Sequence, residues 1–241
     1  MKTTDYILSK IKNIPEGYVF TSDSFLNEDN TKTAVVKALS RMMKSGVISK
    51  LSKGKFYKAK QSVFGELAPS MEQELKDLLE VNGKVIGYLT GTSIYNQLGL
   101  TTQVSNTIQI GRNEVRPQFK RGIYTIKYIK QKNTLSKANI PYLQLLDAIH
   151  FIKKIPDATI KETCERIKSI LKEKKEEDKE RLIFLAKKYA PSTRALLGAL
   201  LDDIEPSSLT DKLFKTLNPV TTYPLNGAKA VLSTTQKWHI V

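Results

Sequence analysis

The stretch TKTAVVKALSRMMKSGVISKLSKGKFYKAK, residues 31–60, places one amphipathic helix directly before a short hairpin. Thr31 suits the N-cap of this helix and Gly46 suits its C-cap, so the helix is expected to run between them. Val35, Leu39 and Met42 fall on one side of it and predict the face that packs in a core. Two apolar runs, 47–51 and 56–59, flank a turn at 52–55 and predict the hairpin.

The other side of the predicted helix carries no acidic residue, whereas a solvated helix face normally mixes both signs. Its side chains are hydroxyls and cations: Lys32, Thr33, Lys37, Ser40, Arg41 and Lys44. The hairpin adds four lysines and a tyrosine: Lys50, Lys53, Lys55, Tyr57 and Lys58. A positive surface that both elements share indicates contact with a polyanion.

The residues before this stretch supply the rest of a small domain. A helix is expected over 3–14, with Ile7 and Ile11 on its apolar face, followed by a strand at 18–20 and a short helix at 23–26. The order helix, strand, helix, helix, hairpin is typical of a winged helix-turn-helix, which we assign to residues 1–61.

Duplex DNA is the polyanion that such a domain binds, because its last helix enters the major groove. The residues expected to reach base edges are Thr33, Lys37, Ser40 and Arg41. The hairpin lysines and Tyr57 would meet phosphates, where a cation releases condensed counterions. Two copies would bind an inverted repeat, as a dimer or as cooperative monomers. Two alternatives stay open: the hairpin lysines only keep a small domain soluble, or the winged helix recruits a protein partner.

Composition supports a folded, basic protein. The chain has 241 residues, 40% of them hydrophobic, and a formal net charge of +15. Residues 1–60 hold 12 of the 39 Lys and Arg residues but only 5 of the 24 Asp and Glu residues. The single cysteine, Cys164, excludes an intrachain disulfide and suits a reducing cytoplasm. No secretion signal and no membrane-spanning stretch is expected. With two distant histidines, neither a metal site nor a cofactor is expected.

The middle of the chain predicts a small sheet. Residues 62–70 resemble a linker, and Ser70 suits the cap of a helix over 71–81. Strands are expected at 85–89, 107–110 and 122–129, and a short helix at 92–98 capped by Thr92 or Ser93. A second group of cations lies near the predicted strand ends: Arg112, Arg116, Lys120 and Arg121. It forms either a second basic patch for DNA, RNA or a partner protein, or an ordinary solvated loop.

Four segments in this order resemble the AbiEi-type antitoxins of bacterial abortive-infection toxin–antitoxin systems, in particular a branch of unknown function. They are KGKFYKAK (53–60), FGELAPS (64–70), GYLTGTSIYNQLGL (87–100) and SNTIQIGRN (105–113). The resemblance implies an N-terminal winged helix that binds inverted repeats in its own promoter and represses it. It also implies a larger C-terminal region that neutralises a nucleotidyltransferase-like toxin, directly or indirectly. The last third of the chain matches no motif of that family.

The last third predicts a helical bundle over residues 139–217. Helices are expected at 141–155, 157–175, 179–189, 191–204 and 209–217. His150 is expected to pack beside an apolar face, and Trp238 to anchor the tail in the core. The predicted fold is therefore α+β: a winged helix-turn-helix at 1–61, then a larger domain at 62–241 with a small sheet within 71–135 and these helices.

No enzymatic activity is expected. Asp157 and the run Glu173-Lys174-Lys175 match the sequence pattern of a metal-dependent nuclease motif. Both lie on predicted helices, however, so their carboxylates are not expected to converge on a metal. Asp202 and Asp203 point in different helical directions and are expected to mark a charged helix end. The sequence thus predicts a cytoplasmic antitoxin that represses its own promoter. The alternatives are a plain transcriptional regulator, a winged-helix interaction module, and a nucleic-acid-modifying enzyme with an unrecognised site.

Overall fold

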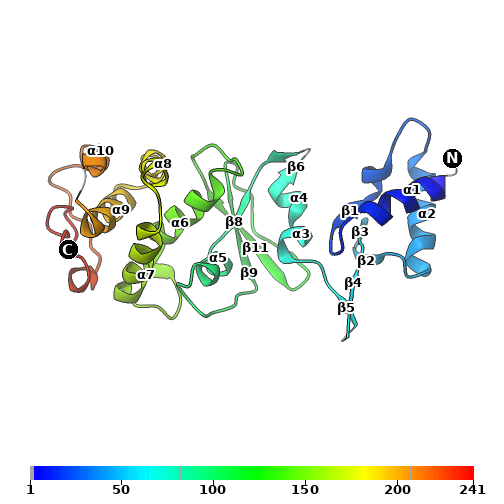
Figure 1. The fold of residues 1–241 in the computed structure, drawn as a ribbon, viewed down its shortest axis with the longest axis horizontal. Helices are drawn as coiled ribbons and strands as arrows, with labels where there is room; N and C mark the ends of the chain where they lie inside the picture. Colours follow the sequence, from blue (N-terminus) through cyan, green and yellow to red (C-terminus); the bar gives the residue numbers. More distant parts are fainter. Residues whose placement is uncertain (1–2, 64, 82, 207) are drawn as a thin grey trace. The chain divides into compact units, whose positions relative to one another are not determined.

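The computed structural model describes residues 3–63, 65–81, 83–206 and 208–241. Two compact units share the chain: the first ends at Leu78 and the second runs from Leu79 to Val241 (Figure 1). Both contain helices and short strands, and helices make up most of the carboxyl-terminal part. The predicted α+β class is therefore confirmed.

The core of the first unit is formed by α1, η1 and α2 on a three-stranded sheet. Its elements, in chain order, are α1 (Thr3–Asn13), β1 (Val19–Thr21), the 3-10 helix η1 (Ser22–Phe25), α2 (Lys32–Lys44), β2 (Ser49–Ser52) and β3 (Lys55–Tyr57). The strands are antiparallel and lie in the order β1-β3-β2. Apolar faces of α1, α2 and η1 meet on this sheet in one core, which contains Ile7, Ile11, Phe20, Phe25, Val35, Ala38, Leu39, Met42 and Ile48.

Both ends of α2 are fixed by the residues that the sequence predicted. The Thr31 hydroxyl accepts a hydrogen bond from the Ala34 amide at 3.3 Å, which satisfies one of the unpaired donors of the first turn. At the other end Gly46 has φ = +72°, and its amide donates to the Met43 carbonyl at 3.2 Å. The Val47 amide donates to the Met42 carbonyl at 2.9 Å. This pair of bonds is a Schellman motif, which stops the helix and turns the chain into β2.

The stretch predicted as a linker at 62–70 is a hairpin instead. Strands β4 (Lys60–Ser62) and β5 (Gly65–Leu67) pair antiparallel. Strand pairing gives the backbone N–H and C=O groups partners within the chain, whereas in an extended linker they would bond to water.

The helix expected over 71–81 is interrupted, and its first part belongs to the first unit. It forms α3 (Met71–Glu74) and α4 (Lys76–Leu79), separated at Leu75. The Val19 amide donates to the Gln73 side chain at 3.4 Å, and the Lys76 ammonium donates to the Tyr18 hydroxyl at 2.7 Å. These contacts carry the unit past the predicted boundary at residue 61, as far as Leu78.

The second unit begins with a small mixed sheet. Its strands are β8 (Tyr88–Thr90), β9 (Thr107–Arg112), β10 (Phe119–Arg121) and β11 (Tyr124–Lys130), in the order β10-β11-β9-β8. The central pair, β9 and β11, is parallel, and both outer pairings are antiparallel. The strand predicted at 85–89 is divided, because β7 (Lys84–Val85) pairs with β6 (Glu80–Val81) in a separate ladder.

Helix α5 (Thr92–Gln97) follows β8 as predicted, but neither Thr92 nor Ser93 caps it. The N-cap position is Gly91, with φ = +77° and no side-chain cap. A Cβ at this position would lie 2.0 Å from the Gln109 side-chain oxygen. A glycine is therefore required here, both for the left-handed backbone and for the close approach of β9.

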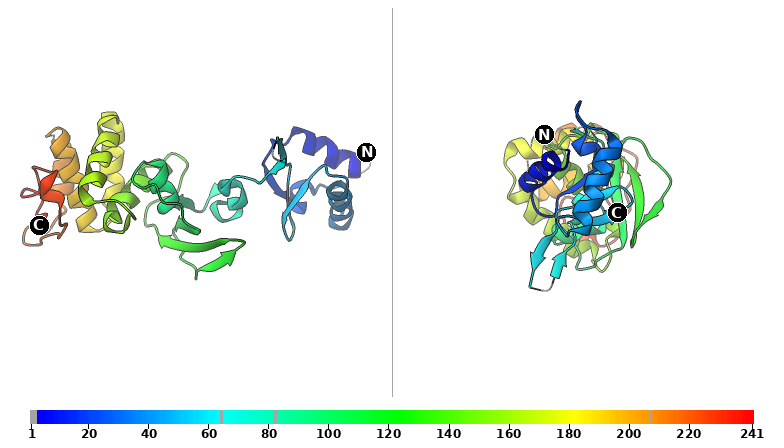
Figure 2. Two further views of the ribbon diagram at one scale, coloured as in Figure 1. Left: turned by 90° about the horizontal axis from the view of Figure 1, so that it is seen from below. Right: turned by 90° about the vertical axis from the view of Figure 1, so that its right-hand side faces the viewer.

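Helices complete the second unit and confirm the predicted bundle. They are α6 (Ile140–His150), η2 (Ile152–Lys154), α7 (Ile160–Lys172), α8 (Glu176–Ala186), α9 (Pro191–Ile204), η3 (Ser208–Thr210), α10 (Asp211–Phe214) and η4 (Ala228–Ala230). Helix α9 is central and contacts α6, α7, α8 and α10 (Figure 2). Trp238 packs fully buried against Gly198 of α9, as expected of a core anchor.

Candidate nucleic-acid interface

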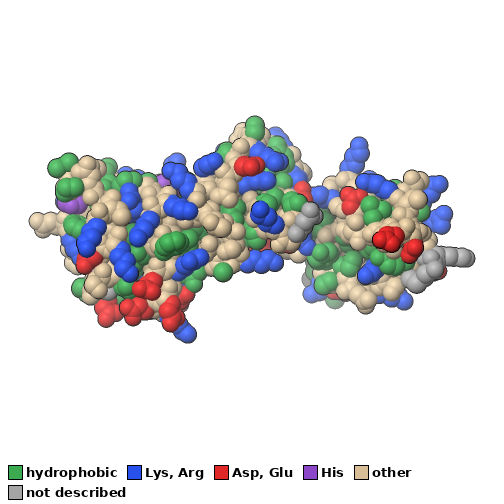
Figure 3. Space-filling view, turned by 90° about the horizontal axis from the view of Figure 1, so that it is seen from above, with side chains coloured by type: hydrophobic (Ala, Val, Ile, Leu, Met, Phe, Trp, Pro, Cys, Tyr) green, Lys and Arg blue, Asp and Glu red, His purple; other side chains and the backbone are tan. Residues whose placement is uncertain are grey.

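Helix α2 presents its cationic side to solvent. Thr33, Lys37, Arg41 and Lys44 are exposed and Ser40 is half-buried, while the opposite face lies in the core. Within the described part of the chain, Lys37, Arg41 and Lys44 form no ion pair and no side-chain hydrogen bond. In Figure 3 the Lys and Arg side chains of the first unit lie mainly along the edges of the visible face, and Asp and Glu side chains lie on the same face. The orientation predicted from helical spacing therefore agrees with the structure.

Lys32, at the start of α2, differs from these residues because it has an acidic neighbour. Its ammonium lies 3.0 Å from the Asp23 carboxylate, and both side chains are more than half exposed. An ion pair in this setting is screened by salt and contributes roughly 0.2–1 kcal/mol. The Lys32 ammonium can therefore leave Asp23 and pair with another anion.

The hairpin of β2 and β3 is only partly available for phosphates. Lys50 and Lys53 are exposed near its turn, where the pairing register shifts between Lys50 and Ser52. Lys55 is mostly buried and lies 2.7 Å from the Asp77 carboxylate of α4. These positions leave Lys50 and Lys53 as the outward cations among the five predicted hairpin residues.

Two of the predicted hairpin residues, Lys58 and Tyr57, are engaged within the first unit. The Lys58 ammonium donates to the backbone carbonyls of Lys12 and Ile14, at 3.1 and 3.0 Å. Those carbonyls close the carboxyl end of α1, where unpaired acceptors and the helix dipole favour a cation. Tyr57 pairs in the centre of the sheet and is only 9% exposed. Neither side chain is placed to meet a phosphate.

The second predicted group of cations does not form one patch. Arg112 ends β9 and is buried, which contradicts its placement on a basic surface. Arg116 and Lys120 are exposed in the next loop and strand, while Arg121 is half-buried with its guanidinium 5.6 Å from the centre of the Phe119 ring. Arg112 lies on the same face of β9 as the buried Ile108 and Ile110, because the side chains of a strand alternate between the two faces of a sheet.

A buried polar network in the second unit escaped the sequence prediction. Asp147 of α6 is 1% exposed and accepts three hydroxyl hydrogen bonds, from Tyr88 at 2.8 Å, Thr90 at 2.9 Å and Tyr189 at 2.7 Å. The Gln131 amide donates to both tyrosine hydroxyls at 2.8 Å. Burial raises the pKa of Asp147 to about 6, against the opposing effect of these bonds. In the sequence, the only sign of this network was one carboxylate, Asp147, on the apolar face of a predicted helix.

Two further titratable side chains of this unit, His150 and Cys164, are packed within the fold. His150 contacts the rings of Phe151 and Tyr189 and bonds the Thr193 hydroxyl through Nδ1 at 2.7 Å, in line with the packing role expected of it. Burial raises the pKa of the Cys164 thiol to about 11, so it stays protonated at neutral pH. In the residues that the structure describes, no three His, Cys, Asp or Glu side chains are placed to hold a metal ion.

Asp202 and Asp203 form hydrogen bonds with the tail of the chain, whereas the sequence predicted that they mark a charged helix end. Asp202 is 3% exposed and accepts hydrogen bonds from the Trp238 indole at 2.9 Å and from the Lys237 ammonium. Asp203 accepts from the Ser233 amide and hydroxyl, both at 2.7 Å, and pairs with the Lys168 ammonium. Each carboxylate therefore holds residues 233–238 against α9.

These features define a two-unit α+β protein whose first unit carries a one-sided cationic helix beside a β-hairpin. None of the described helices is long and apolar enough to cross a membrane. Residues 6–182 match DUF6088, described as a family of unknown function, and the chain belongs to that family.

The fold has a solved counterpart. The crystal structure of the RV2827C protein from Mycobacterium tuberculosis is similar, with a TM-score of 0.53 and 13% sequence identity. The match covers 92% of this chain and 84% of that chain, and at this identity it concerns the fold alone. A search of curated proteins found no match.

Proposed function

We propose that the first unit is a winged helix-turn-helix that binds duplex DNA, and that the protein represses its own promoter and acts as an antitoxin. The observation that carries the DNA-binding part is the outer face of α2, where Lys37, Arg41 and Lys44 are exposed without a carboxylate partner among the described residues. The antitoxin part rests on the sequence resemblance to AbiEi-type antitoxins.

The binding mode follows from the positions of these side chains. Helix α2 enters the major groove with Thr33, Lys37, Ser40 and Arg41 toward base edges, and the turn of β2 and β3 lies on the backbone. Since Lys55 and Lys58 are engaged within the first unit, the phosphate contacts per copy number about four or five. The logarithm of the binding constant should therefore fall with the logarithm of salt concentration with a slope of about −4.

The decisive experiment compares two double variants with equal loss of charge. Lys37→Ala with Arg41→Ala changes the proposed recognition face, whereas Lys10→Ala with Lys12→Ala removes two exposed cations from α1. Binding to the promoter DNA upstream of the gene is followed by fluorescence anisotropy, with an unrelated duplex of equal length as competitor. We expect the first variant to lose the preference for the promoter and the second to keep it. Equal behaviour of the two variants would exclude α2 as the recognition helix.

The antitoxin part has a separate test in the full-length chain. We expect the Lys37→Ala, Arg41→Ala variant to lose promoter repression in a reporter strain yet still restore growth when the toxin is induced. That result would place repression and neutralisation in different parts of the molecule. If neither the natural chain nor this variant restores growth while promoter binding is intact, the protein is a regulator without antitoxin activity.

A further inference from the structure

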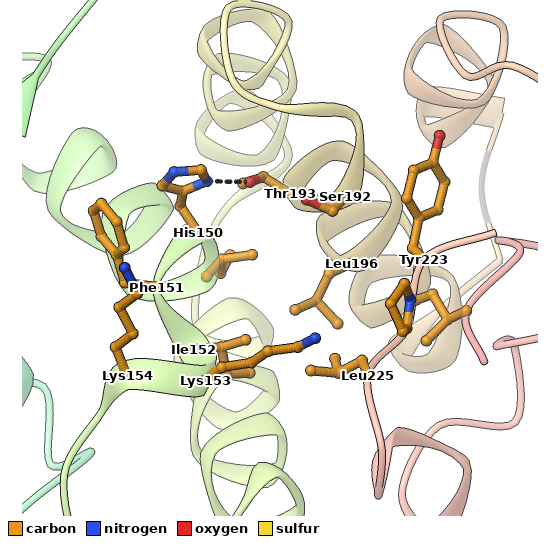
Figure 4. Close-up of a pocket in the computed structure, with 13 residues that line it drawn as sticks. His150, Phe151, Ile152, Lys153, Lys154, Ser192, Thr193, Leu196, Tyr223 and Leu225 are labelled. Carbon is orange, nitrogen blue, oxygen red and sulfur yellow. Dashed lines mark hydrogen bonds between the residues drawn. The ribbon is translucent and has the colours of Figure 1, made fainter. Parts of the chain in front are cut away.

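A cavity of about 310 Å³ lies in the second unit between α6, α9 and the tail. The end of α6 and η2 form one wall, the start of α9 forms another, and Tyr223, Leu225 and Ile240 of the tail close the third (Figure 4). The volume is at the lower end of the range for small-molecule sites, roughly 300–1,000 Å³. This size fits a ligand much smaller than a peptide or a nucleic-acid segment.

The lining of the cavity combines an apolar body with positive charge at its edge. Most of its surface belongs to aliphatic and aromatic side chains, among them Phe151, Leu196, Tyr223 and Leu225. The cationic lining residues are Lys153 and Lys154, His150 also lines the cavity, and the lining includes neither Asp nor Glu. A ligand that matches this surface has an apolar part and an anionic group.

Lys153 is the cation placed to meet that anionic group. Figure 4 shows its side chain extending from η2 across the cavity toward the tail. It forms no ion pair or hydrogen bond with any residue that the structure describes, whereas Lys154 lies 5.4 Å from the centre of the Phe151 ring. A second hollow, of about 390 Å³, shares Ile152, Lys153 and Leu225 with the first, so Lys153 lies where the two meet. An ammonium over apolar surface is well placed for a carboxylate whose chain follows the hollow.

We propose that this cavity binds a small amphipathic carboxylate, with the chain against Leu196 and Leu225 and the carboxylate on Lys153. The site lies wholly in the second unit and does not depend on the proposed DNA binding. Straight-chain carboxylates of increasing length are suitable probes, because each methylene that enters the cavity should tighten binding about fourfold until the cavity is full.

The test is isothermal titration calorimetry of the full-length protein with hexanoate, octanoate and octan-1-ol. We expect octanoate to bind about fifteenfold more tightly than hexanoate, because two more methylenes enter the cavity, and more tightly than the uncharged alcohol. Lys153→Met keeps the aliphatic stem and should weaken octanoate about tenfold, to the level of the alcohol. The matched control, Lys172→Met, changes an exposed lysine outside the cavity and should leave octanoate binding unchanged.

Charge reversal makes the test independent of any general loss of folding. Lys153→Glu should abolish octanoate binding and create binding of octylammonium, a gain that an unfolded variant does not show. The proposal is overturned if octanoate fails to bind the natural chain, or if alcohol and carboxylate bind equally and Lys153→Met changes neither. It is also overturned if sedimentation shows a dimer that the Leu225→Lys variant converts to monomer, since the hollow would then be a contact between copies.

Discussion

Replacing Asp147 by asparagine should make the stability of the second unit less dependent on pH. Burial raises the pKa of this carboxyl from 3.8 to about 6 in the folded state, so folding takes up a proton between these values. The stabilising effect of the protonated group is fully present below 3.8 and is lost as the pH rises through about 6. Each pKa unit corresponds to about 1.4 kcal/mol, so the loss amounts to roughly 3 kcal/mol of unfolding free energy.

The asparagine variant suits this measurement because the network has an alternative arrangement. The amide oxygen of the variant accepts from Tyr88 and Thr90, as the carboxylate does now. Its NH₂ group donates to the Tyr189 hydroxyl, which already lies 3.4 Å from the Leu143 carbonyl and can donate to it. The three hydroxyl groups therefore keep a partner and the charge is removed. The second N–H of the amide has no partner in this arrangement, a cost that is the same at every pH and so leaves the pH dependence unchanged.

The assay is urea unfolding followed by tryptophan fluorescence between pH 3.5 and 7.5. The chain has one tryptophan, Trp238, so the signal reports the second unit alone. Other carboxylates contribute to each curve, among them Asp203, whose pKa is lowered by Lys168 and Ser233 despite burial. Those contributions cancel when the unfolding free energy of the natural protein is subtracted from that of the variant. We expect the difference to rise by roughly 3 kcal/mol from the lowest to the highest pH. A difference that stays constant, or that falls, would refute a buried carboxyl with a raised pKa.

Three further outcomes are expected. Gly198→Ala places a Cβ 2.1 Å from the Trp238 ring and should lower the unfolding free energy by about 2 kcal/mol, measured by the same fluorescence assay. Lys58→Met removes two hydrogen bonds to α1 carbonyls and should cost about 1 kcal/mol in thermal unfolding followed by circular dichroism, without changing the salt slope of DNA binding. Cys164 is buried with a raised pKa, so a thiol reagent should modify it only at urea concentrations that unfold the second unit.

Local signals were sufficient to predict the elements whose ends are fixed by their own sequence. Helix α2 begins after Thr31 and ends before Gly46, because both caps act through bonds to residues three or four positions away. Its exposed cationic side follows from the 3.6-residue period for the same reason. Helix α9 was predicted with its observed ends, since Pro191 suits a first turn and the apolar run that follows is continuous.

Side chains that depend on distant parts of the chain were not predictable in this way. Lys58 was expected to face DNA, but its partners are 44 and 46 residues away at the end of α1. Arg112 is buried because β9 extends as far as this residue, beyond the predicted strand end at 110, and its side chain shares a face with Ile108 and Ile110. The hairpin therefore contributes fewer exposed cations to the candidate interface than the sequence predicted. The polar network around Asp147 was not predicted.

The pair of carboxylates on α9 has a practical consequence for anyone who shortens or extends this polypeptide. Cutting the chain before Ser233 would remove the indole and ammonium groups that donate to Asp202, and would leave this buried carboxylate bonded to the Thr210 hydroxyl. The Leu225 amide also donates to the Val241 carbonyl at 2.6 Å, so the backbone at Val241 helps to hold a residue that lines the cavity. Residues 233–241 are therefore best kept intact in any variant of the second unit.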